Sequence, residues 1–131
     1  MEYKLYIGGK FVVTNERMVV TNHFDNSIVG ETYLAGSKEL ELAIKEALSV
    51  KEELRKLPSY KRYSILMSIA YKIEIRKDEL ATVLAKEAGK PLKYALGEIN
   101  RAIQVFTVAA EESRRLPKEY FSIDWTEAGH G

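Results

Sequence analysis

Cysteine is absent from the 131-residue chain, and this absence excludes several kinds of chemistry. A chain without cysteine has no disulfide framework, no thiolate metal ligand and no thiol nucleophile. The chain also has no excess of one charge sign. Its 20 basic and 19 acidic side chains leave a formal net charge of +1. The two signs alternate along the sequence, whereas nucleic-acid-binding surfaces need a basic face or stripe. We therefore expect no nucleic-acid partner.

Long apolar runs are also missing from the sequence. No stretch is long and apolar enough to cross a bilayer. The first residues, Met1 to Ile7, contain no basic region leading into a long apolar run, which is the pattern of a secretory signal. We expect no membrane partner and a cytoplasmic location. With 46% hydrophobic and 30% charged residues, the composition is that of a globular chain with one domain.

The first third of the sequence has the two-residue period of β-strands. Apolar residues alternate with polar or amphipathic neighbours over 3–7, and Gly8-Gly9 then supplies two residues that tolerate positive φ. A β-prone run resumes at 11–13, which completes a hairpin, and two further β-prone runs follow at 18–20 and 28–34. The pattern predicts antiparallel β hairpins over residues 1–35.

After residue 36 the apolar residues repeat every three to four positions, which is the period of an α-helix. Ser37 is the expected N-cap of the first helix, because its hydroxyl can accept a hydrogen bond from a free N–H of the first turn. Leu40, Ile44 and Leu48 line one side of this helix. We expect Leu40 to make a hydrophobic staple or the first core contact of the helix.

The same period predicts about four helices, of which the last is the longest. Gly89 suits the left-handed position that ends the third helix. The expected helices cover 37–57, a stretch that begins near 59, 80–88 and 92–116. The sequence therefore predicts an α+β fold. We expect a single partial domain over 1–131, with β hairpins at 1–35, helices at 37–117 and an irregular tail at 118–131.

Two Gly-Lys pairs raise the question of a phosphate-binding loop. A Walker loop needs a further glycine upstream and a Ser or Thr directly after the lysine. Gly9-Lys10 is followed by Phe11 and Gly89-Lys90 by Pro91, and neither pair has the upstream glycine. We therefore predict a hairpin turn at the first pair and a helix cap at the second, with no cofactor-binding residue in either.

The chain has two histidines, His23 and His130. Neither has Cys, Asp or Glu at the spacing of metal ligands, so no metal site is predicted. No Gly-x-Ser-x-Gly motif supports a serine nucleophile either. We therefore assign no catalytic residue from the pattern of single residues.

Glu98 and Arg101 are the remaining candidates for a site. They lie three positions apart on the longest expected helix and so share a face. One interpretation is a surface ion pair that contributes roughly a few tenths of a kcal/mol. The other is that Arg101, with its forked set of donors, binds an anionic group of a substrate while Glu98 supports it. The residues alone leave both interpretations open.

Five stretches, taken in order, resemble the N-terminal segment of the aldehyde dehydrogenase superfamily. They are Tyr6-Ile7-Gly8-Gly9-Lys10-Phe11-Val12, Asn22 with Ile28-Val29-Gly30-Glu31, residues 57–66, Glu87-Ala88-Gly89-Lys90-Pro91-Leu92, and Gly97-Glu98-Ile99-Asn100-Arg101-Ala102. The second stretch departs from the family pattern, because His23 stands where a proline is usual. The resemblance covers essentially the whole chain. It is greatest to the archaeal-type non-phosphorylating glyceraldehyde-3-phosphate and lactaldehyde dehydrogenases.

The resemblance implies oxidation of an aldehyde. In the family a cysteine thiolate attacks the carbonyl, hydride passes to NAD or NADP, and a glutamate-activated water releases the acid. The nucleophile and the nucleotide-binding core belong to later regions of the family's chain. The resemblance therefore implies no catalytic and no cofactor-binding residue in this sequence, and we expect the chain to be inactive by itself.

The resemblance also bears on the substrate and on partners. In relatives that oxidise glyceraldehyde 3-phosphate, an arginine reaches the anionic group of the substrate, and Arg101 matches that position with Glu98 in support. Oxidation of lactaldehyde or a semialdehyde is equally open. The expected partner is the remaining aldehyde dehydrogenase polypeptide, or further copies of this chain, bound through an exposed helical face. The alternative is a non-catalytic, self-associating interaction module derived from that fold.

Overall fold

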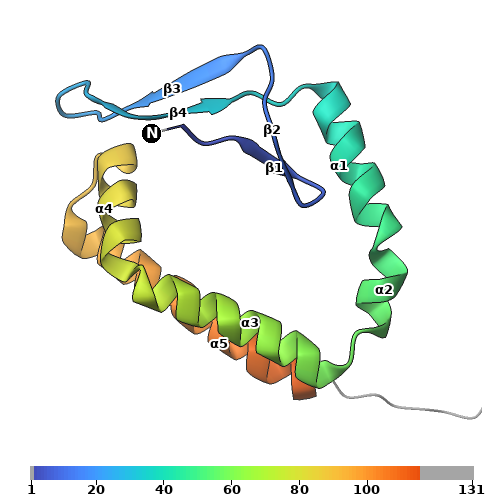
Figure 1. Ribbon diagram of the computed structural model, residues 1–131. Helices are drawn as coiled ribbons and strands as arrows, with labels where there is room; N and C mark the ends of the chain where they lie inside the picture. The colour runs from blue at the N-terminus through green and yellow to red at the C-terminus, as the bar shows by residue number, and fades with distance from the viewer. Residues whose placement is uncertain (1, 116–131) are drawn as a thin grey trace, which may run out of the picture.

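The computed structural model describes residues 2–115. Its elements are β1 (Leu5–Ile7), β2 (Lys10–Val12), β3 (Arg17–Thr21), β4 (Ile28–Tyr33), α1 (Ser37–Ser49), α2 (Lys51–Lys56), α3 (Ser59–Ile75), α4 (Lys77–Ala88) and α5 (Leu92–Arg115). Figure 1 shows an open arc, with the strands at the top, α1 and α2 along one side, α3 and α5 together along the base, and α4 opposite α1. The expected α+β class is confirmed. Leu116 and the predicted tail at 118–131 lie outside the described residues.

The strands form two antiparallel hairpins. In the first, Tyr6 of β1 lies opposite Phe11 of β2, and the turn between them contains Gly8 and Gly9 with φ of 56° and 79°. Side chains are strained at such positive angles, so the predicted glycine turn is confirmed. In the second hairpin β3 pairs with β4, and Tyr33 at the end of β4 is buried.

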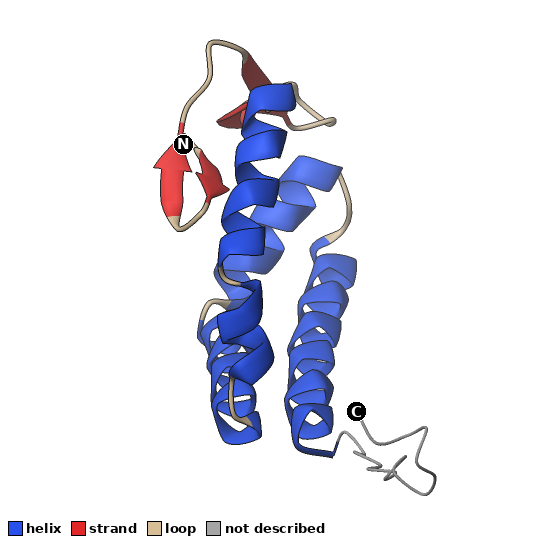
Figure 2. Ribbon diagram, turned by 90° about the vertical axis from the view of Figure 1, so that its right-hand side faces the viewer, coloured by secondary structure: helices blue, strands red, loops and turns tan. Residues whose placement is uncertain are grey.

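The helices α3, α4 and α5 pack against one another. Figures 1 and 2 both show α3 and α5 side by side, and in Figure 2 the strands lie toward the upper end of the molecule. The buried positions of this group are alanines, which allow helix backbones to approach closely. They are Ala70 at 3% exposure and Ala81, Ala95 and Ala110 at 0%. Among residues 2–115, no helix combines the length and apolar character needed to span a membrane.

The helix expected over 37–57 is interrupted at Val50, so that α1 and α2 replace a single helix. The Ser49 hydroxyl donates a hydrogen bond to the Glu46 carbonyl at 2.7 Å. The Val50 N–H instead donates a hydrogen bond to the Leu48 carbonyl. A hydroxyl that competes for a backbone carbonyl and a β-branched side chain both disfavour continued helix, and they coincide at this point.

The apolar side of α1 is exposed, and this includes Leu40, for which the sequence predicted a first core contact. Its N-cap is Gly36 rather than Ser37, and the Gly36 N–H donates to the Glu39 carboxylate at 2.8 Å. The exposed fractions are 60% for Leu40, 46% for Ile44 and 63% for Leu48. The helix has no buried residue and makes its main contacts with β1 and α2. Within residues 2–115, β1 lies beside Leu40 but leaves most of this side exposed.

Candidate functional site

The junction between α4 and α5 positions the residues of the predicted site. α4 ends at Gly89, whose φ of 59° is the left-handed conformation predicted for its cap, and the Gly89 N–H donates to the Ala85 carbonyl. The Lys90 N–H donates to the same carbonyl at 3.2 Å, and Pro91 precedes α5. His23 packs against the cap, since a Cβ added at Gly89 would lie 3.2 Å from the His23 Cβ. The junction therefore favours glycine for two independent reasons.

Glu98 forms an ion pair across this junction. The Lys90 Nζ lies 2.7 Å from the Glu98 Oε1, and the two side chains are 28% and 40% exposed. The hydrogen bond from Lys90 lowers the pKa of Glu98 below its ordinary value, with smaller contributions from the charges of Lys90 and Arg101. Glu98 is thus held by Lys90 and does not form the ion pair with Arg101 that one interpretation of the sequence proposed. The sequence pattern that could have predicted this ion pair is a lysine just before α5, Lys90, and a carboxylate about two turns into that helix, Glu98.

Arg101 lies on α5, one turn beyond Glu98, and is exposed. With residues 2–115 it makes no hydrogen bond or ion pair, and it acts on Glu98 only through the field of its charge. A guanidinium presents five N–H donors in a planar fork that matches a carboxylate, sulfonate or phosphate. The side chain therefore has its donors available for an anion, while the acid beside it is held by another cation.

The surroundings of Gly8 and Gly89 do not fit a phosphate of NAD or NADP. A nucleotide phosphate approaches the backbone of a glycine turn closely, through the space that a Cβ would otherwise occupy. At Gly8 that space is filled by Glu46, whose Cγ lies 2.7 Å from an added Cβ and whose carboxylate repels phosphate. At Gly89 it is filled by His23. The described residues also contain no group of three or more His, Cys, Asp or Glu that could hold a metal, and His130 lies outside them.

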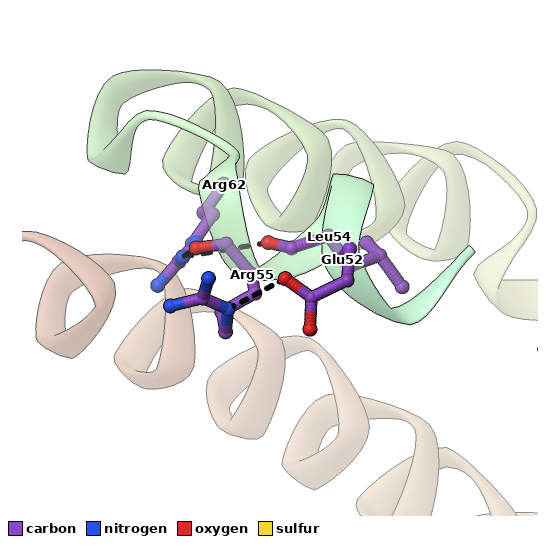
Figure 3. Close-up of polar contacts among 4 residues, drawn as sticks. All are labelled: Glu52, Leu54, Arg55 and Arg62. Atoms are coloured by element: carbon purple, nitrogen blue, oxygen red, sulfur yellow. Dashed lines mark hydrogen bonds and ion pairs between the residues drawn. The ribbon is translucent and has the colours of Figure 1, made fainter. Parts of the chain in front are cut away.

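A second junction, between α2 and α3, is fixed by Arg62. Figure 3 shows its guanidinium donating to the carbonyl oxygens of Arg55 at 2.8 Å and Leu54 at 3.4 Å. The Arg55 side chain pairs with Glu52, with 3.0 Å between Nε and Oε2. The last carbonyls of a helix have no partner within the helix, and Arg62 supplies one. Arg62 lies in the stretch 57–66 that resembles the family, but the sequence alone predicted no role for it.

The chain is similar in sequence and structure to known aldehyde dehydrogenases. The model of the aldehyde dehydrogenase family matches residues 11–130. Lactaldehyde dehydrogenase from Methanocaldococcus jannaschii is 40% identical over 106 residues, which are 81% of this chain and 23% of that protein. 3-Sulfolactaldehyde dehydrogenase from Priestia aryabhattai is 33% identical over 119 residues, 90% of this chain and 24% of that protein. The crystal structure of aldehyde dehydrogenase 21 from Physcomitrella patens, in complex with the reaction product succinate, matches with a TM-score of 0.87 and 30% identity, over 99% of this chain and 27% of that chain.

These matches place the chain in the N-terminal region of its relatives, and it spans about a quarter of the length of the curated proteins. Solved relatives bind NAD or NADP. The fold, the order of the hairpins and helices, and the match over most of the sequence agree with one another. The chain belongs to the aldehyde dehydrogenase family.

Proposed function

We propose that this chain supplies the N-terminal helical part of an NAD(P)-dependent aldehyde dehydrogenase and that Arg101 binds the anionic group of an aldehyde substrate. The observation that carries the proposal is the state of Arg101, which is exposed on α5 and has no carboxylate partner among residues 2–115. Lys90 engages Glu98 at 2.7 Å, so that acid does not neutralise the arginine by direct contact. Glu98 and Lys90 act as positioning residues around the anion-binding group.

Two of the relatives support an anionic substrate class. The Priestia protein is named for a sulfonated aldehyde, and the Physcomitrella protein was solved with succinate, a dicarboxylate, as reaction product. The Methanocaldococcus relative is named for lactaldehyde, which is uncharged. A free guanidinium favours the anionic class over the neutral one, because charge-assisted hydrogen bonds are stronger than neutral ones.

The chain is proposed to contribute no nucleophile. Its 131 residues contain no cysteine, whereas the family's chemistry uses a cysteine thiolate. The purified chain, mixed with NAD or NADP and a panel of aldehydes, is expected to form no reduced nicotinamide. Clear aldehyde-dependent turnover by the chain alone would contradict this part of the proposal.

A chimera tests the role of Arg101 in an active context. The corresponding N-terminal quarter of the Methanocaldococcus enzyme would be replaced by this chain, and KM measured for lactaldehyde and for 3-sulfolactaldehyde. Arg101→Gln should raise KM for the sulfonated aldehyde about tenfold, the effect of losing one charge-assisted hydrogen bond, and change KM for lactaldehyde less than about twofold. Arg101→Lys should restore part of the loss.

The matched control is Arg115→Gln at the end of the same helix, where the arginine already pairs with Glu112. This variant should leave both KM values unchanged. An equal loss for the two aldehydes in Arg101→Gln, or no loss for either, would contradict a substrate-binding role. Urea unfolding of each variant would show whether a loss reflects folding instead.

A second candidate function is favoured by the exposed side of α1. Leu40, Ile44 and Leu48 form a stripe of exposed apolar side chains on α1, which has no buried residue. Aldehyde dehydrogenases are generally oligomeric enzymes. We propose that this stripe packs on the remaining polypeptide of the enzyme, and that in its absence copies of the chain associate through it. A module that associates but never supports turnover would be the non-catalytic alternative.

Light scattering separates these cases. Self-association that falls with Leu48→Glu, together with activity of the chimera, supports the enzyme proposal. Self-association with a folded but inactive chimera supports the non-catalytic module. A strict monomer over a wide range of concentration would contradict the proposed role of the stripe.

The cytoplasmic location stays a prediction.

A further inference from the structure

A hollow at the far end of the α3–α5 pair is lined by basic side chains. It lies where the α2–α3 junction meets the last turns of α5. The lining residues are Arg55, Lys56, Leu57, Pro58, Ser59, Arg62, Ser113 and Arg114. Four of these carry a positive charge and none is acidic, although the chain as a whole is nearly neutral. The positive charge is therefore concentrated at this place.

Of the four basic side chains that line the hollow, two are held in position by uncharged groups, namely Arg62 and Arg114. Arg62 is a half-buried residue, and its guanidinium donates to two backbone carbonyls, as Figure 3 shows. The Arg114 guanidinium stacks on the ring of Tyr63, with 3.9 Å from its central carbon to the ring centroid. Carbonyl oxygens and an aromatic face orient a guanidinium without cancelling its charge.

Other arginines of the chain are neutralised by neighbouring acids, and one of them, Arg55, lines the hollow and pairs with Glu52 at 3.0 Å. Arg76 pairs with Glu79 at 2.7 Å, and Arg115 pairs with Glu112 at 3.4 Å. Arg62 and Arg114 have no such acid within residues 2–115. Ordered positive charges without counter-charges favour an anion, because the side chains lose little further freedom when the ligand binds.

We propose that this hollow binds a small anion bearing phosphate groups, with Arg62 and Arg114 contacting it from two different helices. Forked guanidinium groups match phosphate oxygens in pairs, and Lys56 adds a third positive charge at the rim. The site differs from the one proposed at Arg101, since the thirteen positions between Arg101 and Arg114 correspond to roughly 20 Å along a helix. It therefore stands independently of the proposed substrate role.

Titration of the full 131-residue chain with inorganic pyrophosphate, at constant ionic strength, tests the proposal by calorimetry. Saturable binding is expected, and Arg114→Gln should weaken it about fivefold through loss of one charge-assisted hydrogen bond at a partly hydrated site. Lys56→Gln should weaken it about twofold. Thermal unfolding of the variants would show that each is still folded.

Arg115→Gln is the matched control. It removes the same charge one residue further along α5, outside the lining of the hollow, and should weaken binding less than about twofold through screened charge alone. Two results would overturn the proposal. One is the absence of saturable binding to the unmodified chain. The other is an equal loss in Arg114→Gln and Arg115→Gln, which would mean that net charge and not the hollow attracts the anion.

Discussion

The group α3–α5 and the arm formed by α1 and α2 are both amphipathic, but only the first is packed. Ala110 of α5 is fully buried, whereas Leu48 of α1 is 63% exposed. In the first region, residues of this chain supply both sides of the interface. In the second, they supply one side only. An apolar stripe therefore indicates where a partner binds, but not whether the same chain provides that partner.

The largest expected effect is a charge placed inside the packed group. Ala110→Asp buries an unpaired carboxylate between α3 and α5 and should lower the free energy of unfolding by about 3 kcal/mol. The control is Ala109→Asp, an exposed position on the same helix, with an expected change of about 0.5 kcal/mol or less. Urea unfolding followed by circular dichroism measures both. Equal losses would show that α5 is not held by this interface.

The next effect concerns the cap that joins α4 to α5. Gly89→Ala should cost about 1–2 kcal/mol, because an L side chain is strained at a φ of 59° and approaches His23. Gly97→Ala in the middle of α5 should instead stabilise the chain by about 0.5–1 kcal/mol, since an added Cβ meets nothing within 4 Å and alanine favours helix. Opposite signs in thermal unfolding are predicted. A shared sign would mean that the cap geometry is wrong.

A smaller effect is expected in the exposed arm. Leu48→Ala should change the free energy of unfolding by less than about 0.5 kcal/mol, because the side chain is already in water. Leu66→Ala, at a half-buried position on α3, should cost about 1–2 kcal/mol. The pair is compared by urea unfolding at low protein concentration, where self-association is minimal. Similar losses would remove the contrast between the two regions.

The smallest effect is a dependence on pH at the α4–α5 junction. Lys90 lowers the pKa of Glu98 in the folded chain from an ordinary value of 4.5. The pair therefore stabilises the fold fully above that ordinary value, and the stabilisation is lost as pH falls through the lowered one. Glu98→Gln should unfold at lower urea than the unmodified chain near neutral pH, and the gap should close in acid. A gap that widens in acid would contradict the sign.

The parts of the fold that depend on neighbouring residues could be predicted from the sequence. Positive φ at Gly8-Gly9 and at Gly89 follows from glycine at a hairpin turn and at a helix end, and both were confirmed. The break at Val50 could not be predicted, because it depends on the Ser49 hydroxyl choosing a backbone carbonyl. Helical period alone allowed a continuous helix there.

The candidate site was predictable only in part. Spacing placed Glu98 and Arg101 on one face of α5, and both lie on that helix. The pairing of Glu98 with Lys90 depends on how the chain turns between α4 and α5, eight positions away, and no local pattern fixes that direction. The basic hollow joins residues of α2, α3 and α5 that are far apart in sequence, so it was visible only in the folded chain.

Amide hydrogen exchange of the unmodified chain tests the contrast between the two regions most directly. We predict that amides of α5 and α3 exchange slowest, and that amides of α1 exchange at least about a hundredfold faster because that helix opens without disturbing the packed group. Protection of α1 as strong as that of α5, in a chain shown to be monomeric, would contradict it.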